Sequence, residues 1–247
     1  MLRALILATL LLAATGRIAP AGAGLPEDAA PLTPASPVAP ATARGALVWL
    51  HGSYDAATDP RPADPDWLAP LLARGYDLWH FDRPTRPDPL AEGGARLLHG
   101  LAALRHGGYR RIVVAGFSRG AFIALPALAR PDLADAVAAI SPAAHGRRED
   151  RKPAALAAFA EPLRAAQAMR FAFVMLRDDP WDPGPDARAA MARQSAPGRA
   201  GLLLLLDRPA GIDGHMGSFE PAFTRRFAAC LAAFLDATAG PDACAGR

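Results

Sequence analysis

The segment RIVVAGFSRG, residues 111–120, decides how the rest of the chain is interpreted. Its first half is rich in β-branched residues, which is typical of a buried strand, and residues 120–129 have apolar positions at helical spacing. A G-x-S-x-G sequence centred on Ser118 joins the two. In a strand–turn–helix setting, the glycines permit a tight, strained turn that raises the serine hydroxyl above the sheet. We therefore expect Ser118 to be a nucleophile, the alternative being a serine that caps the helix.

Short apolar segments alternate with helical patterns on both sides of this turn. Strands are expected at 46–50, 76–81, 111–115, 134–140, 171–176 and 201–206, and helices at 67–73, 90–105, 120–129, 186–193 and 221–235. The last two strand segments are apolar throughout, as strands covered on both faces of a parallel sheet are. The alternation predicts an α/β fold, a three-layer sandwich with a mainly parallel sheet of about six strands.

A serine hydroxyl is a weak nucleophile at neutral pH, so a general base must take its proton during attack. Among the six histidines, His215 lies in a glycine-rich segment between the last expected strand and the final helix, where a loop can present its ring. We expect His215 to be the base. The other histidines lie in or beside expected strands, helices or an insertion, and we expect structural or exposed positions for them: His51, His80, His99, His106 and His145.

The imidazole of such a base needs a carboxylate on its other nitrogen, which fixes the tautomer and stabilises the imidazolium. Three acids follow the apolar run 171–176 in a loop braced by prolines: Asp178, Asp179 and Asp182. One of them should face the histidine. Asp213 is closer in sequence but shares the histidine's own loop, which makes its geometry less suitable. A solvated turn without a catalytic acid is the remaining alternative.

Acyl transfer also needs backbone N–H groups directed at the negative charge that develops on the carbonyl oxygen. Arg119, directly after the serine, is expected to supply one. The second should come from the turn after the strand at 46–50, which ends in a His-Gly pair. Ser53 is the first choice for this donor and Tyr54 the second.

Several large side chains flank the proposed residues. Tyr54, Phe117, Trp181 and Met216 are expected to line an apolar substrate pocket, although aromatic residues in such positions are as often core. Residues 146–168 form an insertion with a charged start and its own amphipathic helix. This insertion is either a mobile lid or a surface helix packed on the sheet.

The order Ser118, acid, His215, with His-Gly upstream, resembles the α/β-hydrolase superfamily over about residues 45–236. Small members are the most similar, including dienelactone-hydrolase-like and short-chain esterase-like proteins, and the family's first antiparallel strands are expected to be missing. In the family's usual form, a hydrophobic or similar residue and then proline stand three and four residues after the acid. This form favours Asp179, with Asp182 in the hydrophobic slot, and leaves Asp178 as the alternative.

The resemblance implies a serine hydrolase that cleaves a carboxylic ester, thioester or lactone through an acyl-enzyme. It implies a small-molecule acyl substrate and no metal or organic cofactor. A peptidase of the same fold and a non-catalytic exported binding protein are the alternatives.

The N-terminus has the pattern of a signal peptide. An uncharged run, residues 4–14, follows a single arginine, and Ala21-Gly22-Ala23 supplies a small-residue cleavage site. The run is too short for a permanent membrane span, which needs about 20 apolar residues. We therefore expect a signal peptide at 1–23, a Pro/Ala-rich linker at 24–44, the hydrolase domain at 45–238 and a tail at 239–247. An uncleaved anchor is the alternative to export into the periplasm or the medium.

Export would change the net charge of the mature chain and would place its cysteines in an oxidising compartment. Removal of Arg3 and Arg17 with the leader leaves 25 basic residues against 24 acidic ones, and the arginines form no stripe, which argues against nucleic acid as a partner. Cys230 and Cys244 are the only cysteines of the chain. In an oxidising compartment they are expected to form a bridge, the alternative being two unpaired thiols.

Export predicts a mature N-terminus near Gly24 and a protein without free thiols. The intact mass of periplasmic or secreted material, measured with and without reduction and alkylation, checks both. A full-length mass, or two thiols that react without reduction, would contradict export.

Overall fold

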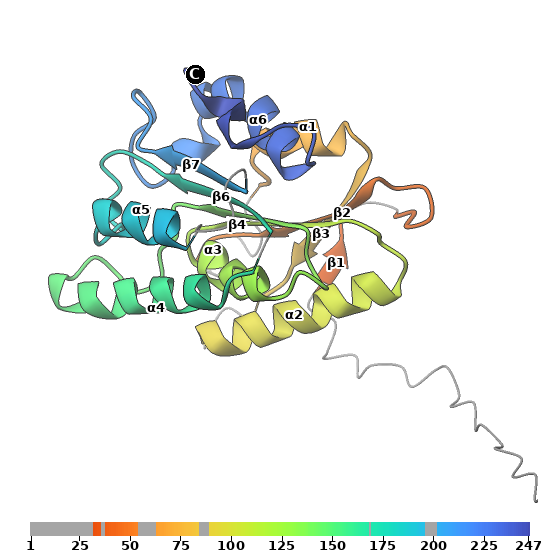
Figure 1. Ribbon diagram of the computed structural model, residues 1–247, viewed down its shortest axis with the longest axis horizontal. Coiled ribbons are helices and arrows are strands. Elements are labelled where there is room, and N and C mark those ends of the chain that lie inside the picture. The colour runs from red at the N-terminus through yellow and green to blue at the C-terminus, as the bar shows by residue number, and fades with distance from the viewer. Residues whose placement is uncertain (1–31, 36–37, 54–62, 84–88, 168, 196–201) are drawn as a thin grey trace, which may run out of the picture.

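The computed structural model describes residues 32–35, 38–53, 63–83, 89–167, 169–195 and 202–247 (Figure 1). The predicted signal peptide lies outside these residues. Within the described ranges, no helix is long and apolar enough to cross a membrane.

A twisted sheet of seven strands runs through the described part of the chain, in the order β1-β3-β2-β4-β5-β6-β7. The strands are β1 (Leu32–Pro34), β2 (Gly45–Leu50), β3 (Tyr76–Phe81), β4 (Ile112–Phe117), β5 (Ala136–Ile140), β6 (Arg170–Met175) and β7 (Leu203–Asp207). From β3 to β7 all neighbours are parallel. The expected α/β fold is confirmed, and each of the six expected strands is present within a few residues of its predicted bounds.

β1 is a strand that the sequence did not indicate, because it lies within residues 24–44, which we assigned to a linker. It pairs antiparallel with β3, Leu32 opposite Phe81 and Pro34 opposite Trp79. An edge strand tolerates proline, since its outer side needs no hydrogen-bond donors. The expectation that the chain lacks a leading antiparallel strand was therefore wrong.

Helices cover both faces of the sheet, α1 and α6 on one face and α2, α3, α4 and α5 on the other (Figure 1). The α-helices are α1 (Ala69–Leu72), α2 (Leu90–His106), α3 (Arg119–Ala124), α4 (Lys152–Ala165), α5 (Pro185–Gln194) and α6 (Pro221–Leu235). Short 3₁₀ segments are η2 (Asp66–Leu68), η3 (Leu125–Ala129), η4 (Glu149–Arg151), η5 (Gly217–Phe219) and η6 (Pro241–Cys244). The three layers predicted from the alternating pattern are present.

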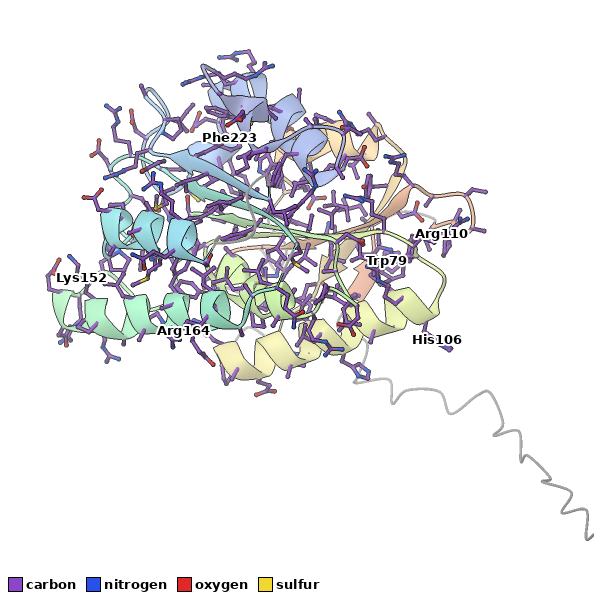
Figure 2. All side chains as sticks on the ribbon, in the orientation of Figure 1. Trp79, His106, Arg110, Lys152, Arg164 and Phe223 are labelled. Atoms are coloured by element: carbon purple, nitrogen blue, oxygen red, sulfur yellow. A yellow bond between two sulfur atoms is a disulfide. The ribbon has the colours of Figure 1, made fainter. Side chains whose placement is uncertain are left out.

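β4 shows how the two cores arise from one strand. Successive side chains of a strand point to opposite faces, so Ile112 and Val114 pack with α2 and α3, while Val113 and Ala115 pack with α6. All six residues of β4 are buried. On the α6 face, Phe223 lies fully buried between the helix and the sheet (Figure 2). Burial of one such side chain contributes about 1.5–3 kcal/mol.

The insertion at 146–168 contains α4, and this helix contributes to the core. Its residues Ala155, Phe159 and Leu163 are buried, and Phe159 and Leu163 belong to the core on the α2 side of the sheet. Among the described residues of the insertion, Gly146 at its start is the one that lines the pocket beside Ser118. The arrangement favours the packed-helix interpretation for α4, and a cover over the serine stays a prediction.

Cys230 of α6 and Cys244 of η6 form a disulfide, with their Cα atoms 5.3 Å apart. This is the pairing expected from the sequence. The two cysteines are 14 positions apart in the sequence, and for a loop of this size the chain-entropy model gives a stabilisation of about 3 kcal/mol. It fixes the C-terminal tail against the last helix.

A buried carboxylate joins the two ends of the domain. Asp236, directly after α6, is 3% exposed and accepts hydrogen bonds from Arg44 Nε (2.8 Å), Arg74 Nη1 (3.2 Å) and the Tyr76 hydroxyl (2.7 Å). Burial by itself raises the pKa of Asp236, but the hydrogen bonds from Arg44 and Tyr76 outweigh burial and hold the pKa below its ordinary value. The ionised carboxylate therefore stabilises the folded state.

Replacement of this carboxylate should lower stability in a pH-dependent way. Because the folded pKa is depressed, the contribution of Asp236 is complete above the unfolded pKa of about 3.9 and is lost as the pH falls through the folded pKa. Asp236→Asn should cost about 2 kcal/mol at pH 7 and less at pH 3. Urea unfolding at both pH values measures this, with the exposed Asp150→Asn as control. An equal cost at the two pH values would contradict the role of the charge.

Candidate active site

Ser118 occupies a strained turn between β4 and α3. Its φ and ψ are +54° and −119°, a combination rarely adopted by residues other than glycine. A Cβ at Gly116 would lie 2.5 Å from the Gly120 oxygen, and one at Gly120 would lie 2.3 Å from the Leu50 oxygen. Both glycines of the G-x-S-x-G sequence are thus required because backbone occupies the space that a side chain would need.

A continuous chain of hydrogen bonds joins the serine to an acid. The Ser118 Oγ lies 2.9 Å from His215 Nε2, and His215 Nδ1 lies 2.8 Å and 3.0 Å from the two carboxylate oxygens of Asp179. With its proton on Nδ1, His215 donates to Asp179 and accepts from the serine hydroxyl. The structure brings together the three residues that the sequence analysis selected for nucleophile, base and acid.

The loops after β6 and β7 are held together by backbone contacts. Arg177 and Asp213 form an isolated parallel bridge, and the N–H of Gly214 donates to the Arg177 oxygen at 2.7 Å. Gly214 has a φ of +72°, which glycine adopts without strain. The Asp213 carboxylate lies beside Arg177, at 3.8 Å from Nε. This pairing of the loops places Asp179 opposite His215.

The other two acids of the loop after β6 have different surroundings. Asp178 is exposed and has a φ of +52°. Asp182 accepts the N–H of Gly184 at 3.1 Å and lies 3.4 Å from Arg188. Asp179, whose side chain is 2% exposed, also accepts the N–H of Trp181 at 2.8 Å. The structure therefore places Asp179, and neither neighbour, against the histidine.

The turn after β2 approaches the serine closely. A Cβ at Gly52 would lie 2.9 Å from Phe117 Cδ1 and 3.2 Å from Ser118 Cβ, so only a residue without a side chain fits. The approach follows from the sheet, because β2 and β4 are parallel neighbours with Leu50 opposite Gly116. Ser53 and Arg119, the two expected N–H donors, both lie beside the serine in the pocket.

Comparison with solved structures finds a similar fold in several esterases. No protein-family model and no curated protein matches the sequence. The Pyrococcus furiosus esterase Pf2001 is 16% identical, with 79% of this chain and 84% of that chain covered and a TM-score of 0.59. Est1E from Butyrivibrio proteoclasticus is 14% identical, with 79% and 89% covered and a TM-score of 0.58. Brefeldin A esterase, a bacterial homologue of human hormone sensitive lipase, is 18% identical, with 88% and 80% covered and a TM-score of 0.56.

The chain has the α/β-hydrolase fold. Identities at this level show the fold alone, so the chemistry of this chain must be argued from its own site. The resemblance inferred from the order of serine, acid and histidine is confirmed at the level of the fold.

The hydrolase fold opens a pocket of about 210 Å³ above the serine. Its described lining consists of Ser53, Phe117, Ser118, Arg119, Ala143, Ala144, Gly146, Trp181, His215 and Met216. Three of the four expected substrate-contacting residues are among them, and the fourth, Tyr54, lies outside the described residues. Trp181 and Met216 are exposed by 37% and 53%, which leaves apolar surface at the pocket mouth.

Aromatic rings surround the histidine. The Phe117 ring lies 4.9 Å from the His215 ring between centroids, and the Trp181 ring lies 6.0 Å from it. The Arg147 guanidinium lies over the Trp181 ring, 4.9 Å from its centroid. These contacts restrict the imidazole to the orientation in which both of its nitrogens are hydrogen-bonded.

The sequence analysis missed the residues that follow β5. Ala143, Ala144 and Gly146 line the pocket because β5 is the parallel neighbour of β4, so its carboxyl end lies at the same edge of the sheet as the serine. A search of every strand end at that edge would have found them. The Arg119 side chain also reaches this loop and donates to the Ala144 oxygen at 3.4 Å.

The remaining histidines have structural or exposed positions, as expected. His51 is buried beside the turn after β2, His80 pairs with Asp64 at 2.9 Å, and His145 packs against Phe122, whereas His99 and His106 are exposed on α2. Among the described residues, no group of three or more histidine, cysteine, aspartate or glutamate side chains is placed to hold a metal.

Arg188 of α5 contacts the loop after β6, which carries Asp178, Asp179 and Asp182 and is called the acid loop. Its side chain is 1% exposed, donates to the Pro142 oxygen at 2.7 Å and lies between the rings of Phe122 and Phe159. Burial lowers the pKa of Arg188 and raises the pKa of Asp182, and each opposes the shift of the other by its charge. The pair links the loops after β5 and β6.

Loss of this cation should destabilise the fold by leaving the Asp182 carboxylate buried without its partner. Arg188→Met is expected to cost about 3–5 kcal/mol at pH 7. The cost should be smaller near pH 4, because the raised pKa of Asp182 favours the neutral carboxyl in the folded state. Urea unfolding measures both values.

A double variant and a control sharpen this test. Adding Asp182→Asn to Arg188→Met should restore part of the stability, because no buried charge is left unpaired. Arg193→Met, on the exposed side of the same helix, should change stability little. A double variant less stable than the single one would show that the pair is not the cause.

Proposed function

We propose that this protein is a serine hydrolase that cleaves a carboxylic ester, thioester or lactone through an acyl-enzyme. The observation that carries the proposal is the unbroken hydrogen-bonded series from Ser118 through His215 to Asp179, at the base of an open pocket. A structural serine at a helix start would need neither a histidine at hydrogen-bond distance nor a carboxylate behind it.

In the first half-reaction, the Ser118 oxygen attacks the carbonyl carbon of the substrate while His215 Nε2 takes the hydroxyl proton. The carbonyl oxygen becomes an oxyanion, and the N–H groups of Ser53 and Arg119 are proposed to stabilise it. When the intermediate collapses, the imidazolium gives its proton to the leaving oxygen or sulfur. The acyl group stays on the serine.

In the second half-reaction, water replaces the leaving group and His215 takes its proton. Attack of this water on the acyl carbon and collapse of the intermediate release the acid and return the proton to the serine. Asp179 acts in both halves by holding Nδ1–H of the imidazole, which keeps Nε2 free to accept a proton. Its near-complete burial makes this interaction stronger than it would be in water.

Esters of small, apolar acids fit the pocket best. Its lining consists mostly of alanine, glycine, aromatic and methionine side chains, and its volume is about 210 Å³. The similar solved structures include esterases, a lipase and a dienelactone hydrolase, which supports ester-type bonds rather than peptide bonds. We further propose that the enzyme acts outside the cytoplasm, with which its disulfide is compatible.

A fluorophosphonate probe and p-nitrophenyl esters test the proposal. The wild type should be labelled on Ser118 and should hydrolyse acetate and butyrate esters faster than long-chain esters, and Ser118→Ala should abolish both. Asp179→Asn should lower kcat by up to about 10⁴-fold, because the histidine tautomer is no longer fixed. Steady-state kinetics and mass spectrometry of the labelled peptide provide the measurements.

Asp178→Asn is the matched control, because this acid is adjacent in sequence and exposed. It should leave kcat nearly unchanged. A large loss in Asp178→Asn with a mild one in Asp179→Asn would reject the assigned acid. A folded wild type that is neither labelled nor active would favour a binding protein, and cleavage of peptide amides in preference to esters would favour a peptidase.

A further inference from the structure

Arg83, just beyond the end of β3, binds the turn that follows β2. Arg83 is buried, with 7% of its surface exposed. Its Nη2 donates to the backbone oxygens of His51 and Gly52, each at 2.6 Å. The His51 ring lies in the same group, with Nδ1 2.6 Å from the Gly52 oxygen. One guanidinium nitrogen thus fixes two successive carbonyl groups of a short turn.

These contacts determine where the N–H groups of the turn point. A peptide unit is planar and trans, so its N–H points away from its C=O. Because the Gly52 oxygen is directed at Arg83, the N–H of Ser53 is directed to the opposite side. Ser53 lines the pocket beside Ser118, whereas Arg83 is not among the described residues that line it. The N–H is therefore directed to the side on which the substrate carbonyl would lie.

The turn needs such a support because of its glycine. Gly52 must lack a side chain to lie against Phe117 and Ser118, and this same property gives its backbone more freedom than other residues have. Rotation of the Gly52–Ser53 peptide would replace an N–H donor with a carbonyl oxygen, which repels a developing oxyanion. A permanently charged arginine that binds both carbonyls opposes this rotation.

We propose that Arg83 is a positioning residue that orients the Ser53 N–H to stabilise the oxyanion. The inference rests on the proposed hydrolase function and adds to it a residue outside the pocket. It assigns two different roles within the site. Asp179 and His215 activate the serine, and Arg83 orients the Ser53 N–H that stabilises the oxyanion. Loss of Arg83 should therefore weaken transition-state binding without weakening substrate binding.

The test compares wild type, Arg83→Met and Arg83→Lys with p-nitrophenyl acetate and with phenylboronic acid, which forms a tetrahedral adduct on a serine. Arg83→Met should lower kcat by about 100-fold, the effect expected for loss of one oxyanion donor. KM should change little, because ground-state binding is retained. Affinity for phenylboronic acid should fall by a similar factor to kcat. Arg83→Lys, which retains a cation and a donor, should be intermediate.

Arg170→Met is the matched control. Arg170 also donates from one nitrogen to two backbone oxygens, those of Phe234 (2.9 Å) and Ala239 (2.7 Å), but it lies at the start of β6, away from the pocket. Its loss should lower the unfolding temperature and leave kcat nearly unchanged. If Arg83→Met does not fold, the intermediate kcat of a folded Arg83→Lys with unchanged KM carries the test.

Each outcome has a distinct meaning. An inactive, unlabelled wild type overturns the proposed function and this inference with it. An active wild type with unchanged kcat in folded Arg83→Met or Arg83→Lys overturns the role of Arg83 alone. The same holds if Arg170→Met loses as much kcat as Arg83→Met at an equal loss of unfolding temperature, since the effect would then be one of general stability.

Discussion

Gly120 lies so close to the turn after β2 that a Cβ at this position would be 2.3 Å from the Leu50 oxygen and 2.5 Å from the His51 oxygen. This contact depends on the parallel pairing of β2 and β4, whose carboxyl ends are adjacent in the sheet. This backbone contact holds the strained serine turn next to the Gly52–Ser53 turn without involving a catalytic side chain. The rest of the site is arranged around these two pieces of backbone, and the strain at Ser118 is maintained because β4 is buried on both faces.

Arginines that lie outside the pocket support the loops that form it. Arg83 binds the turn after β2, and Arg188 binds the loop after β5 and lies beside the acid loop after β6. Arginine suits this role because its planar guanidinium presents several donors at fixed angles and stays charged when buried. Loops need such support because their backbone carbonyls are not satisfied by a neighbouring strand. The loops around the pocket are thus held by two cations that are not among the described residues lining it.

The sequence by itself determined the local features of this protein. Short apolar segments that alternate with helical patterns predicted six of the strands, and the two segments at 171–176 and 201–206 are apolar throughout, as strands covered on both faces of a parallel sheet are. The G-x-S-x-G segment identified Ser118, because steric exclusion of side chains in a tight turn is a property of neighbouring residues. The order of strands and loops indicated His215 and three candidate acids, and the resemblance to the hydrolase family favoured Asp179 among them. The structure places His215 at hydrogen-bond distance from both Ser118 and Asp179.

Only the tertiary structure decided the features that depend on contacts between distant segments. β1 is a strand because β3 offers it an open edge, although the prolines of the segment 24–44 indicate a linker. The pocket residues after β5 owe their role to the neighbouring position of β4. Arg83 and Arg188 resemble every other arginine in the sequence, and their burial arises from packing that no local pattern encodes. A local pattern specifies the backbone conformation of a segment and the spacing of its buried residues. The partner of a buried charge is set by the fold as a whole.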